Sequence, residues 1–217
     1  METMTGLMGG LNRILDWFTK LAFLNILWVG GIVVGLGVFG FFPATIALFA
    51  VVRKWVMHEL DTPIFKTFIQ SYKKEFLKGN LLGMIIVGCS LVLYIDYQFI
   101  QISTNSIVPL FTLPLGIVIL LFICTLFYVL PMFVHFDMKM KELWRNAFFM
   151  MLMNPILTLM MLLTTAGLLI LYTFSPPLML IFSGNLLALS IMWPAYRAFQ
   201  KVTLKKEKQE VNIEIGS

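Results

Sequence analysis

The stretch that decides the fold is Gly40-Phe-Phe-Pro-Ala-Thr-Ile-Ala-Leu-Phe-Ala-Val-Val-Arg-Lys-Trp55. It ends an apolar run that begins at Leu21 and contains no charged residue before Arg53. One helix over this run would be about 48 Å long, whereas the hydrocarbon core of a bilayer is only about 30 Å thick. A single straight span therefore fits poorly.

A helical hairpin accommodates the same run better. Several glycines between residues 35 and 40 precede Pro43, and proline is well tolerated at the first position of a helix. We therefore predict a first span over about residues 21–40, a tight turn, and a short second span over about residues 43–57. One long span is the alternative.

Composition places the whole chain among membrane proteins. Of its 217 residues, 59% are hydrophobic and 12% are charged, and the mean hydropathy is +0.90. Soluble domains carry about 25% charged residues. The apolar runs are continuous rather than alternating, which excludes a β-barrel. We predict an all-α, polytopic transmembrane helical bundle of about six spans.

The basic residues fall into four clusters between the apolar runs. They are Arg13 and Lys20; Arg53, Lys54, Lys66, Lys73, Lys74 and Lys78; Lys139, Lys141 and Arg145; and Arg197, Lys201, Lys205, Lys206 and Lys208. Positive residues accumulate on the cytoplasmic side. An even number of spans must then separate successive clusters, so the hairpin is favoured and both termini are expected in the cytoplasm.

The rest of the chain follows from the same pattern. Further spans are predicted over about residues 80–101, 109–134 and 148–172, and a last one that ends near Arg197. We expect one transmembrane domain over residues 1–200 and a charged, disordered cytoplasmic tail over residues 201–217. The basic, amphipathic segment over residues 62–78 is typical of a helix that lies on the inner leaflet.

Eight residues are candidates for structural, lipid or partner contacts: Asn25, Pro43, Thr45, Arg53, Lys54, Trp55, Lys73 and Lys74. A buried asparagine such as Asn25 is typical of a hydrogen bond between membrane helices. Arg53 and Lys54 either anchor the helix end at the interface or hold a phosphate or lipid headgroup. We find no pattern for a catalytic residue, a metal site or a cofactor. The net charge of +5 is explained by topology, so we expect no nucleic-acid partner.

Three segments resemble one known family. They are Leu24-Asn-Ile-Leu-Trp28, Pro43 to Trp55, and Pro63-Ile-Phe-Lys-Thr-Phe68 with Phe76 beyond it, and together they are similar to the YesL-like bacterial integral membrane proteins. That family usually has a glycine before the proline, where this chain has Phe42. The resemblance implies a protein of the bacterial cytoplasmic membrane, with no established activity, often encoded near carbohydrate-uptake genes.

Two functions from different classes follow. The first is a non-enzymatic accessory or scaffold protein in the lipid bilayer, partnered by carbohydrate importer subunits. The alternative is a small-molecule facilitator, with a polar path along Asn25, Thr45 and Asn185. The pairs Gly31-x-x-x-Gly35 and Gly79-x-x-x-Gly83 also fit close helix packing or a homo-oligomer.

Overall fold

A computed structural model describes residues 2–102 and 108–216 of the chain. Side chains are described over residues 9–204, apart from residues 11, 13, 103–107 and 180. Within these limits the chain is helical and has no strand, which confirms the predicted all-α class. The elements are α1 (Glu2–Val34), α2 (Val38–Val56), α3 (Ile64–Lys74), α4 (Phe76–Ile102), the 3-10 helix η1 (Val108–Phe111), α5 (Thr112–His135), α6 (Met140–Met153), α7 (Pro155–Phe174) and α8 (Pro176–Gly216).

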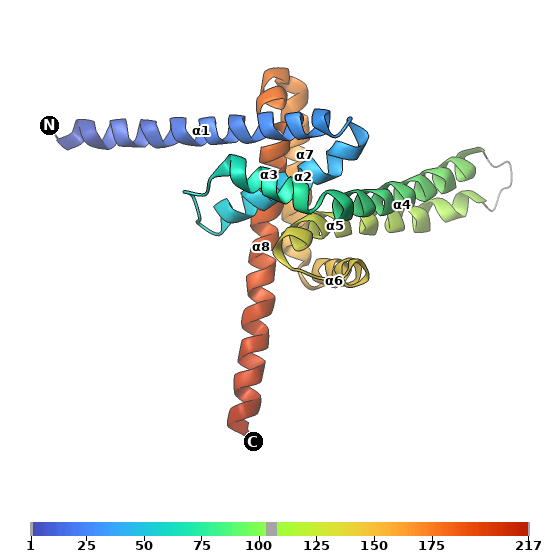
Figure 1. The fold of residues 1–217 in the computed structure, drawn as a ribbon. Helices are drawn as coiled ribbons and strands as arrows, with labels where there is room; N and C mark the ends of the chain where they lie inside the picture. The colour runs from blue at the N-terminus through green and yellow to red at the C-terminus, as the bar shows by residue number, and fades with distance from the viewer. Residues whose placement is uncertain (1, 103–107, 217) are drawn as a thin grey trace.

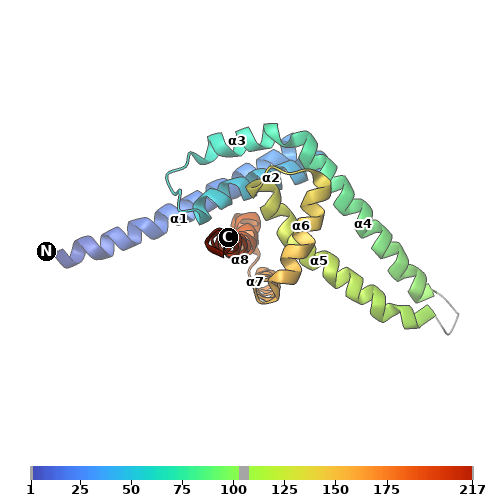
Figure 2. The ribbon, with the colours of Figure 1, turned by 90° about the horizontal axis from the view of Figure 1, so that it is seen from below.

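The helices cross one another rather than running parallel. Helix α1 and the α4–α5 hairpin extend from the centre in opposite directions (Figure 1). Helices α7 and α8 pack together and run across the direction of α1 and of the α4–α5 hairpin, so that Figure 2 shows α8 almost end-on. Helix α2 lies at the crossing and packs against α1, α3, α4, α5 and α8.

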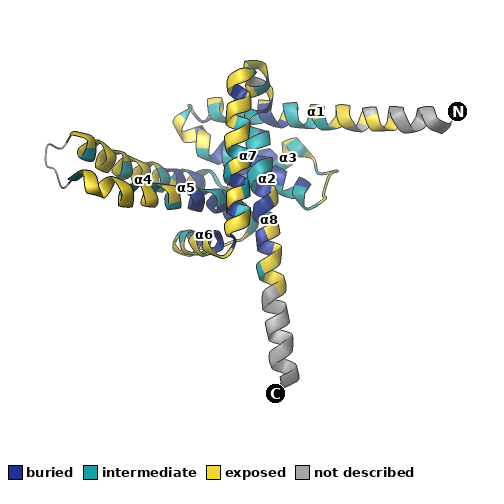
Figure 3. Cartoon of the chain, turned by 180° about the vertical axis from the view of Figure 1, so that it is seen from behind, coloured by how far each residue is buried: buried dark blue, intermediate teal, exposed yellow. Residues whose placement is uncertain are grey.

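Helix α2 is the most buried of the apolar helices. In the most apolar segment of α2, 56% of the residues are buried, whereas the corresponding segments of α1, α4, α5 and α7 bury at most 33%. One side of α2 contributes Phe49 and Trp55 to a cluster with α1, α3 and α8. Ile46 joins a second cluster that includes Tyr128 and Leu143. Figure 3 shows buried residues gathered at this centre and exposed ones along the outer parts of α4, α5 and α7.

The predicted hairpin is confirmed, but its turn comes earlier than expected. Helix α1 ends at Val34 and α2 begins at Val38, so the break lies at residues 35–37. Pro43 is therefore inside α2 and not at its first position, which corrects the predicted boundaries of both spans. The glycine-rich segment makes the turn without proline, and α2 has more than one helical turn before Pro43.

Backbone hydrogen bonds explain where α1 stops. The Gly37 N–H donates to the Ile32 carbonyl (2.8 Å) and the Leu36 N–H to the Val33 carbonyl (3.0 Å), which is the Schellman pattern. Leu36 has a φ of 58°, a left-handed conformation in which glycine is usual. Gly37 follows with a φ of 77° and a ψ of −86°, which an L side chain would rarely adopt.

Away from the turn, the α1 segment around Lys20 lies beside the end of α2, so the basic residues of the two helices are close together. The Trp17 and Trp55 rings make an edge contact with centroids 5.6 Å apart. The Lys20 ammonium donates to the Leu60 carbonyl (3.3 Å), beyond the end of α2. The described parts of the first and second basic clusters therefore lie at one end, as the charge pattern predicted.

The third cluster and the part of the fourth around Arg197 lie at this same end. The Arg53 guanidinium donates to the Val134 carbonyl near the end of α5, which leads into the third cluster. The His135 ring contacts the rings of Tyr196 and Phe199 on α8, which flank Arg197. We call this region the basic end: the end of α2, α3, the start of α4, and the α5–α6 connection.

Five helical segments are long and apolar enough to cross a membrane: Ile14–Val34, Val38–Val56, Phe76–Ile102, Val108–His135 and Pro155–Phe174. These support the predicted polytopic membrane fold. The sixth predicted span crosses Leu180, whose side chain lies outside the described residues, and stays a prediction. The domain division also stays a prediction, and α8 continues through the expected tail as far as Gly216.

One further boundary and the setting of α3 need correction. The fifth span, expected over residues 148–172, is interrupted at Asn154, so its first turns belong to α6 and α7 begins at Pro155. Pro155 has no N–H and favours a helix start here. Helix α3 does not lie on lipid alone, because its apolar face packs on the protein through Phe68, which is only 1% exposed.

Both predicted glycine faces contact α2 of the same chain. A Cβ atom added to Gly31 would lie 3.2 Å from the Ala44 side chain, and one added to Gly79 would lie 2.8 Å from Ile46. One added to Gly83 would collide with the Phe42 ring. These glycines allow α1 and α4 to approach α2 closely. A homo-oligomer, which stays a prediction, would have to use another surface.

Candidate functional site

Five basic side chains border a cavity at the basic end. Arg53 and Lys54 come from α2, Lys74 from α3, Lys78 from α4, and Lys139 from the α5–α6 connection. The cavity has a volume of about 750 Å³. Sites for small ligands usually measure about 300–1,000 Å³. The cavity is therefore large enough for a small molecule or a headgroup.

Helix α2 ends so that its last turn presents two cations to the cavity. The Glu59 N–H donates to the Lys54 carbonyl (2.9 Å) and the His58 N–H to the Trp55 carbonyl (3.0 Å), a second Schellman pattern. Arg53 and Lys54 are half-buried in this last turn. Positive charge there also interacts favourably with the helix dipole.

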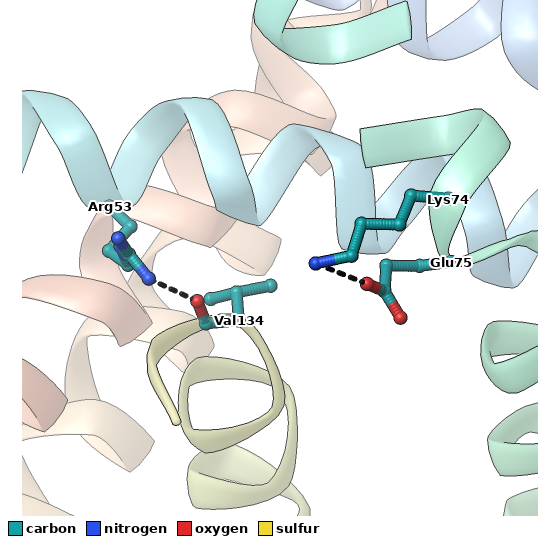
Figure 4. Close-up of polar contacts among 4 residues, drawn as sticks. All are labelled: Arg53, Lys74, Glu75 and Val134. Atoms are coloured by element: carbon teal, nitrogen blue, oxygen red, sulfur yellow. Dashed lines mark hydrogen bonds and ion pairs between the residues drawn. The ribbon is translucent and has the colours of Figure 1, made fainter. Parts of the chain in front are cut away.

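The Arg53 guanidinium is held in place by its neighbour. It donates to the Val134 carbonyl, which lies in the last turn of α5 and has no partner within that helix (Figure 4). A guanidinium has five N–H donors in a rigid, planar arrangement. The Val134 bond therefore fixes Arg53 at the cavity wall and leaves it further donors.

Helix α3 presents a polar face to the same cavity. Thr67, Ser71 and Lys74 all line it, at a spacing that places them on one side of a helix. The Lys74 ammonium lies 3.6 Å from a Glu75 carboxylate oxygen (Figure 4). Lys74 is 79% exposed, so this ion pair contributes at most about 1 kcal/mol. Lys74 can therefore exchange Glu75 for another anion at little cost.

The cavity has an excess of positive charge and an apolar floor. Three acidic side chains, Glu75, Asp137 and Glu142, also line it, against five basic ones. The formal excess is two positive charges. The floor includes Ile46 and Leu143, which are both 1% exposed. The cavity therefore combines a cationic rim with an apolar floor.

The candidate amides lie away from this cavity and join helices. The Asn25 side-chain oxygen accepts a hydrogen bond from the Gly184 N–H (3.2 Å). The Asn185 amide donates to the Leu21 carbonyl (2.5 Å), and both asparagines are at most 2% exposed. Thr45 accepts a hydrogen bond from the Trp28 indole (3.2 Å). Both asparagines thus join α1 to α8 through hydrogen bonds.

The remaining candidates divide by position. Pro43 is buried in α2 beside Gly79 of α4. Trp55 is 4% exposed and packs against Trp17. Lys73 is exposed and does not line the cavity, although Lys74 beside it does. Of the predicted residues, the structure thus brings Arg53, Lys54 and Lys74 together.

Tyr72 fixes α3 to α1 on another side of the helix. Its hydroxyl donates to the Gly31 carbonyl (2.9 Å), and its ring stacks on Phe68. Burial raises the pKa of Tyr72 above its ordinary value. The neutral hydroxyl that this hydrogen bond requires is therefore favoured.

Sequence reasoning found three of the eight charged Lys, Arg, Asp and Glu side chains that line the cavity and missed the other five. Lys78 and Lys139 were assigned to basic clusters but not to a site, and Glu75, Asp137 and Glu142 were not assigned to a site either. The spacing of Thr67, Ser71, Lys74 and Lys78 along one helical face was the available signal. Among the residues that the structure describes, no three His, Cys, Asp or Glu side chains are grouped as metal ligands would be. The expected absence of catalytic, cofactor and metal sites stays a prediction.

Comparison with known proteins decides the family. The family model described as "Protein of unknown function, DUF624" matches residues 21–97. The chain is 35% identical over 201 residues to "Uncharacterized protein YesL" of Bacillus subtilis (strain 168), covering 93% of this chain and 95% of that protein. The chain belongs to the YesL-like family.

Two further YesL-like relatives come from the same organism. "Uncharacterized protein YteU" is 36% identical over 197 residues, which cover 91% of this chain and 88% of the relative. "Uncharacterized protein YesV" is 37% identical over 185 residues, which cover 84% and 88%. No solved structure matches the chain. The segment matched by the family model contains the end of α1, all of α2 and α3, and most of α4, and so much of the cavity wall.

Proposed function

We propose that this YesL-like protein is a non-enzymatic accessory or scaffold protein of the bacterial cytoplasmic membrane, with several spans and a partner-binding surface at its basic end. One observation carries the proposal. Basic side chains from α2, α3, α4 and the α5–α6 connection converge at one end of the apolar helices. By the positive-inside rule, that end faces the cytoplasm.

The partner is proposed to be a subunit of a carbohydrate importer. The support is the family resemblance, together with the exposed basic side chains on α3 and α6 at the basic end. Lys66, Lys73 and Lys141 are exposed there and lie outside the cavity, so they are free to meet an acidic surface. The surrounding bilayer is the other proposed partner.

The buried amides favour this role over that of a facilitator. A transport path needs polar groups that water or a substrate can reach. Asn25 and Asn185 are instead almost fully buried and hydrogen-bonded to neighbouring helices. The candidate path is therefore used for helix packing in this conformation.

Affinity purification tests the proposal directly. The tagged chain, expressed at its natural level, is crosslinked in native membranes, solubilised in mild detergent, and its partners are identified by mass spectrometry. We expect importer subunits with the wild-type chain and their loss with Lys66→Glu and Lys141→Glu combined. Recovery of the chain alone, or of the same proteins with an unrelated membrane protein, contradicts an accessory role. Uptake of oligosaccharides into proteoliposomes above the level of empty liposomes would favour the facilitator.

A further inference from the structure

The cavity at the basic end has the chemistry of an anion site. Its five cations come from elements widely separated in sequence, so its charge is not that of one exposed helix face. Three acidic residues compensate only part of this charge. An additional anion would therefore be stabilised there.

The donors point to an anion with several oxygens. Arg53, fixed by the Val134 carbonyl, provides a planar set of N–H donors from α2. Thr67 and Ser71 add hydroxyls from α3, and Lys78 and Lys139 add ammonium groups from two other sides. A carboxylate has two oxygens, whereas a phosphate can accept hydrogen bonds from several directions at once. Arginine and lysine together are typical of phosphate recognition.

The floor indicates that the phosphate carries an organic substituent. Ile46 and Leu143 are nearly inaccessible at the base, and Ala50, Leu81 and Phe133 extend the apolar wall. A bare ion would leave this part of a cavity of about 750 Å³ unfilled. Basic pockets between membrane helices on the cytoplasmic side are suited to lipid headgroups.

We propose that the cavity lined by Arg53, Lys54, Lys74, Lys78 and Lys139 binds the phosphate group of an anionic phosphate ester, supplied by a phospholipid headgroup or by a soluble phosphate compound. This site goes beyond the proposed accessory function and does not depend on a protein partner. The α3 hydroxyls and the α2 guanidinium orient the phosphate, and the apolar floor contacts the group attached to it.

Two pairs of substitutions separate the cavity from general surface charge. The rim variant combines Lys78→Gln and Lys139→Gln. The matched control combines Lys73→Gln and Lys141→Gln, which removes the same charge from exposed positions outside the cavity. Each variant is delipidated in detergent, and equal melting temperatures without ligand show that both are folded. If the rim pair does not fold, Lys78→Gln and Lys73→Gln are compared singly.

Binding is measured by native mass spectrometry and by the thermal shift of tryptophan fluorescence, at about 0.15 M salt to screen distant charges. The probes are phosphatidylglycerol, diacylglycerol with the same chains, glycerol 3-phosphate and inorganic phosphate. We expect a phosphate ester, phosphatidylglycerol or glycerol 3-phosphate, to bind more tightly than inorganic phosphate. Its affinity should be about a hundredfold weaker in the rim variant, because each lysine hydrogen bond to a charged group is worth about tenfold. The control pair should lose less than about fivefold.

The outcomes are distinct. Binding of phosphatidylglycerol alone identifies a lipid headgroup as the source, and binding of glycerol 3-phosphate identifies a soluble phosphate ester. Inorganic phosphate that binds as tightly as either ester would contradict the proposed organic substituent. Equal losses in the rim and control variants would show that only surface charge acts, and would overturn the site. Failure of every phosphate probe, or equal binding of diacylglycerol, would also overturn it. None of these results depends on whether an importer subunit is recovered.

Discussion

Replacing Gly40 by alanine should destabilise the α1–α2 hairpin. A Cβ atom at residue 40 would lie 2.5 Å from the Ile32 carbonyl oxygen and 2.6 Å from the Gly31 carbonyl oxygen of α1. Both are backbone atoms of a regular helix, so no side chain can rotate away. The two helices would have to separate where they now pack most closely.

The magnitude follows from two opposing terms. Overpacking of a tight contact costs about 1–3 kcal/mol, and the upper value applies because the obstructing atoms are backbone. Alanine in place of glycine gains about 1 kcal/mol of helix propensity. We therefore expect Gly40→Ala to lower the free energy of unfolding by about 2 kcal/mol, or the melting temperature by about 4–8 °C.

The assay is thermal unfolding in detergent, followed by tryptophan fluorescence, with Gly30→Ala as the control. Gly30 lies in α1 of the same hairpin, and a Cβ atom there would meet nothing within 4 Å. Its variant should melt at the wild-type temperature or slightly above. If Gly40→Ala is as stable as Gly30→Ala, α1 and α2 do not pack as closely as described, and the account of the hairpin is wrong.

Three further predictions concern the same region. Leu36→Gly should raise the free energy of unfolding by about 0.5–1 kcal/mol, measured by thermal unfolding. Relief of the left-handed backbone, worth about 1–2 kcal/mol, exceeds the cost of the extra freedom of glycine in the unfolded chain. A lower melting temperature would contradict the left-handed conformation described at residue 36. Tyr72→Phe should cost about 1 kcal/mol at neutral pH by loss of the hydrogen bond to Gly31. Burial raises the pKa of Tyr72 from its ordinary value of 10.0, so this contribution is complete below pH 10 and is lost as the pH rises through the raised pKa. If the difference in unfolding free energy between Tyr72→Phe and the wild type stays constant at alkaline pH, the assignment is wrong. Reporter enzymes fused after Gly37 and after Glu59 should lie outside and inside the cell respectively, and finding both on one side would refute the two-span interpretation.

The hairpin could be predicted from length and charge, but its turn could not be located. The run from Leu21 was too long for one span, and the basic clusters required an even number of crossings. Proline is common at the start of a helix, so the second span was predicted to begin at Pro43 instead of Val38. The real turn depends on Leu36 in a conformation that leucine seldom takes, and no sequence pattern signals that choice.

A different error occurred at Asn154. Continuous apolarity over residues 148–172 suggested one span, although Asn154-Pro155 is an ordinary signal for a helix boundary. The Asn154 side chain donates to the Met150 carbonyl (3.1 Å) at the end of α6, which helps to satisfy that helix end. Hydropathy averaged over a long window conceals such a boundary, because α6 ends in apolar residues.

The cavity lay beyond what one sequence can provide. Charge parity predicts that the second and third basic clusters share a side of the membrane, and the contact between Arg53 and the Val134 carbonyl agrees with this. It does not predict that Lys78 and Lys139 border the same space. That depends on how α4 and α5 pack against α2, which is decided by contacts between residues far apart in the chain.

Helix α2 shows why hydropathy and burial differ in this protein. It has the lowest mean hydropathy of the five membrane-length segments, 1.4, yet the largest buried share. The most apolar of the five, Val108–His135, which comprises η1 and α5, has only 33% of its residues buried. Lipid is as apolar as leucine, so a helix gains little by exchanging lipid for another apolar helix, and close contact between small residues decides the packing. Gly40, Ala44 and Ala47 provide that contact and are all buried. The stretch from Gly40 to Trp55 therefore organises the fold through its small residues and its central position, and the more hydrophobic helices around it face outward.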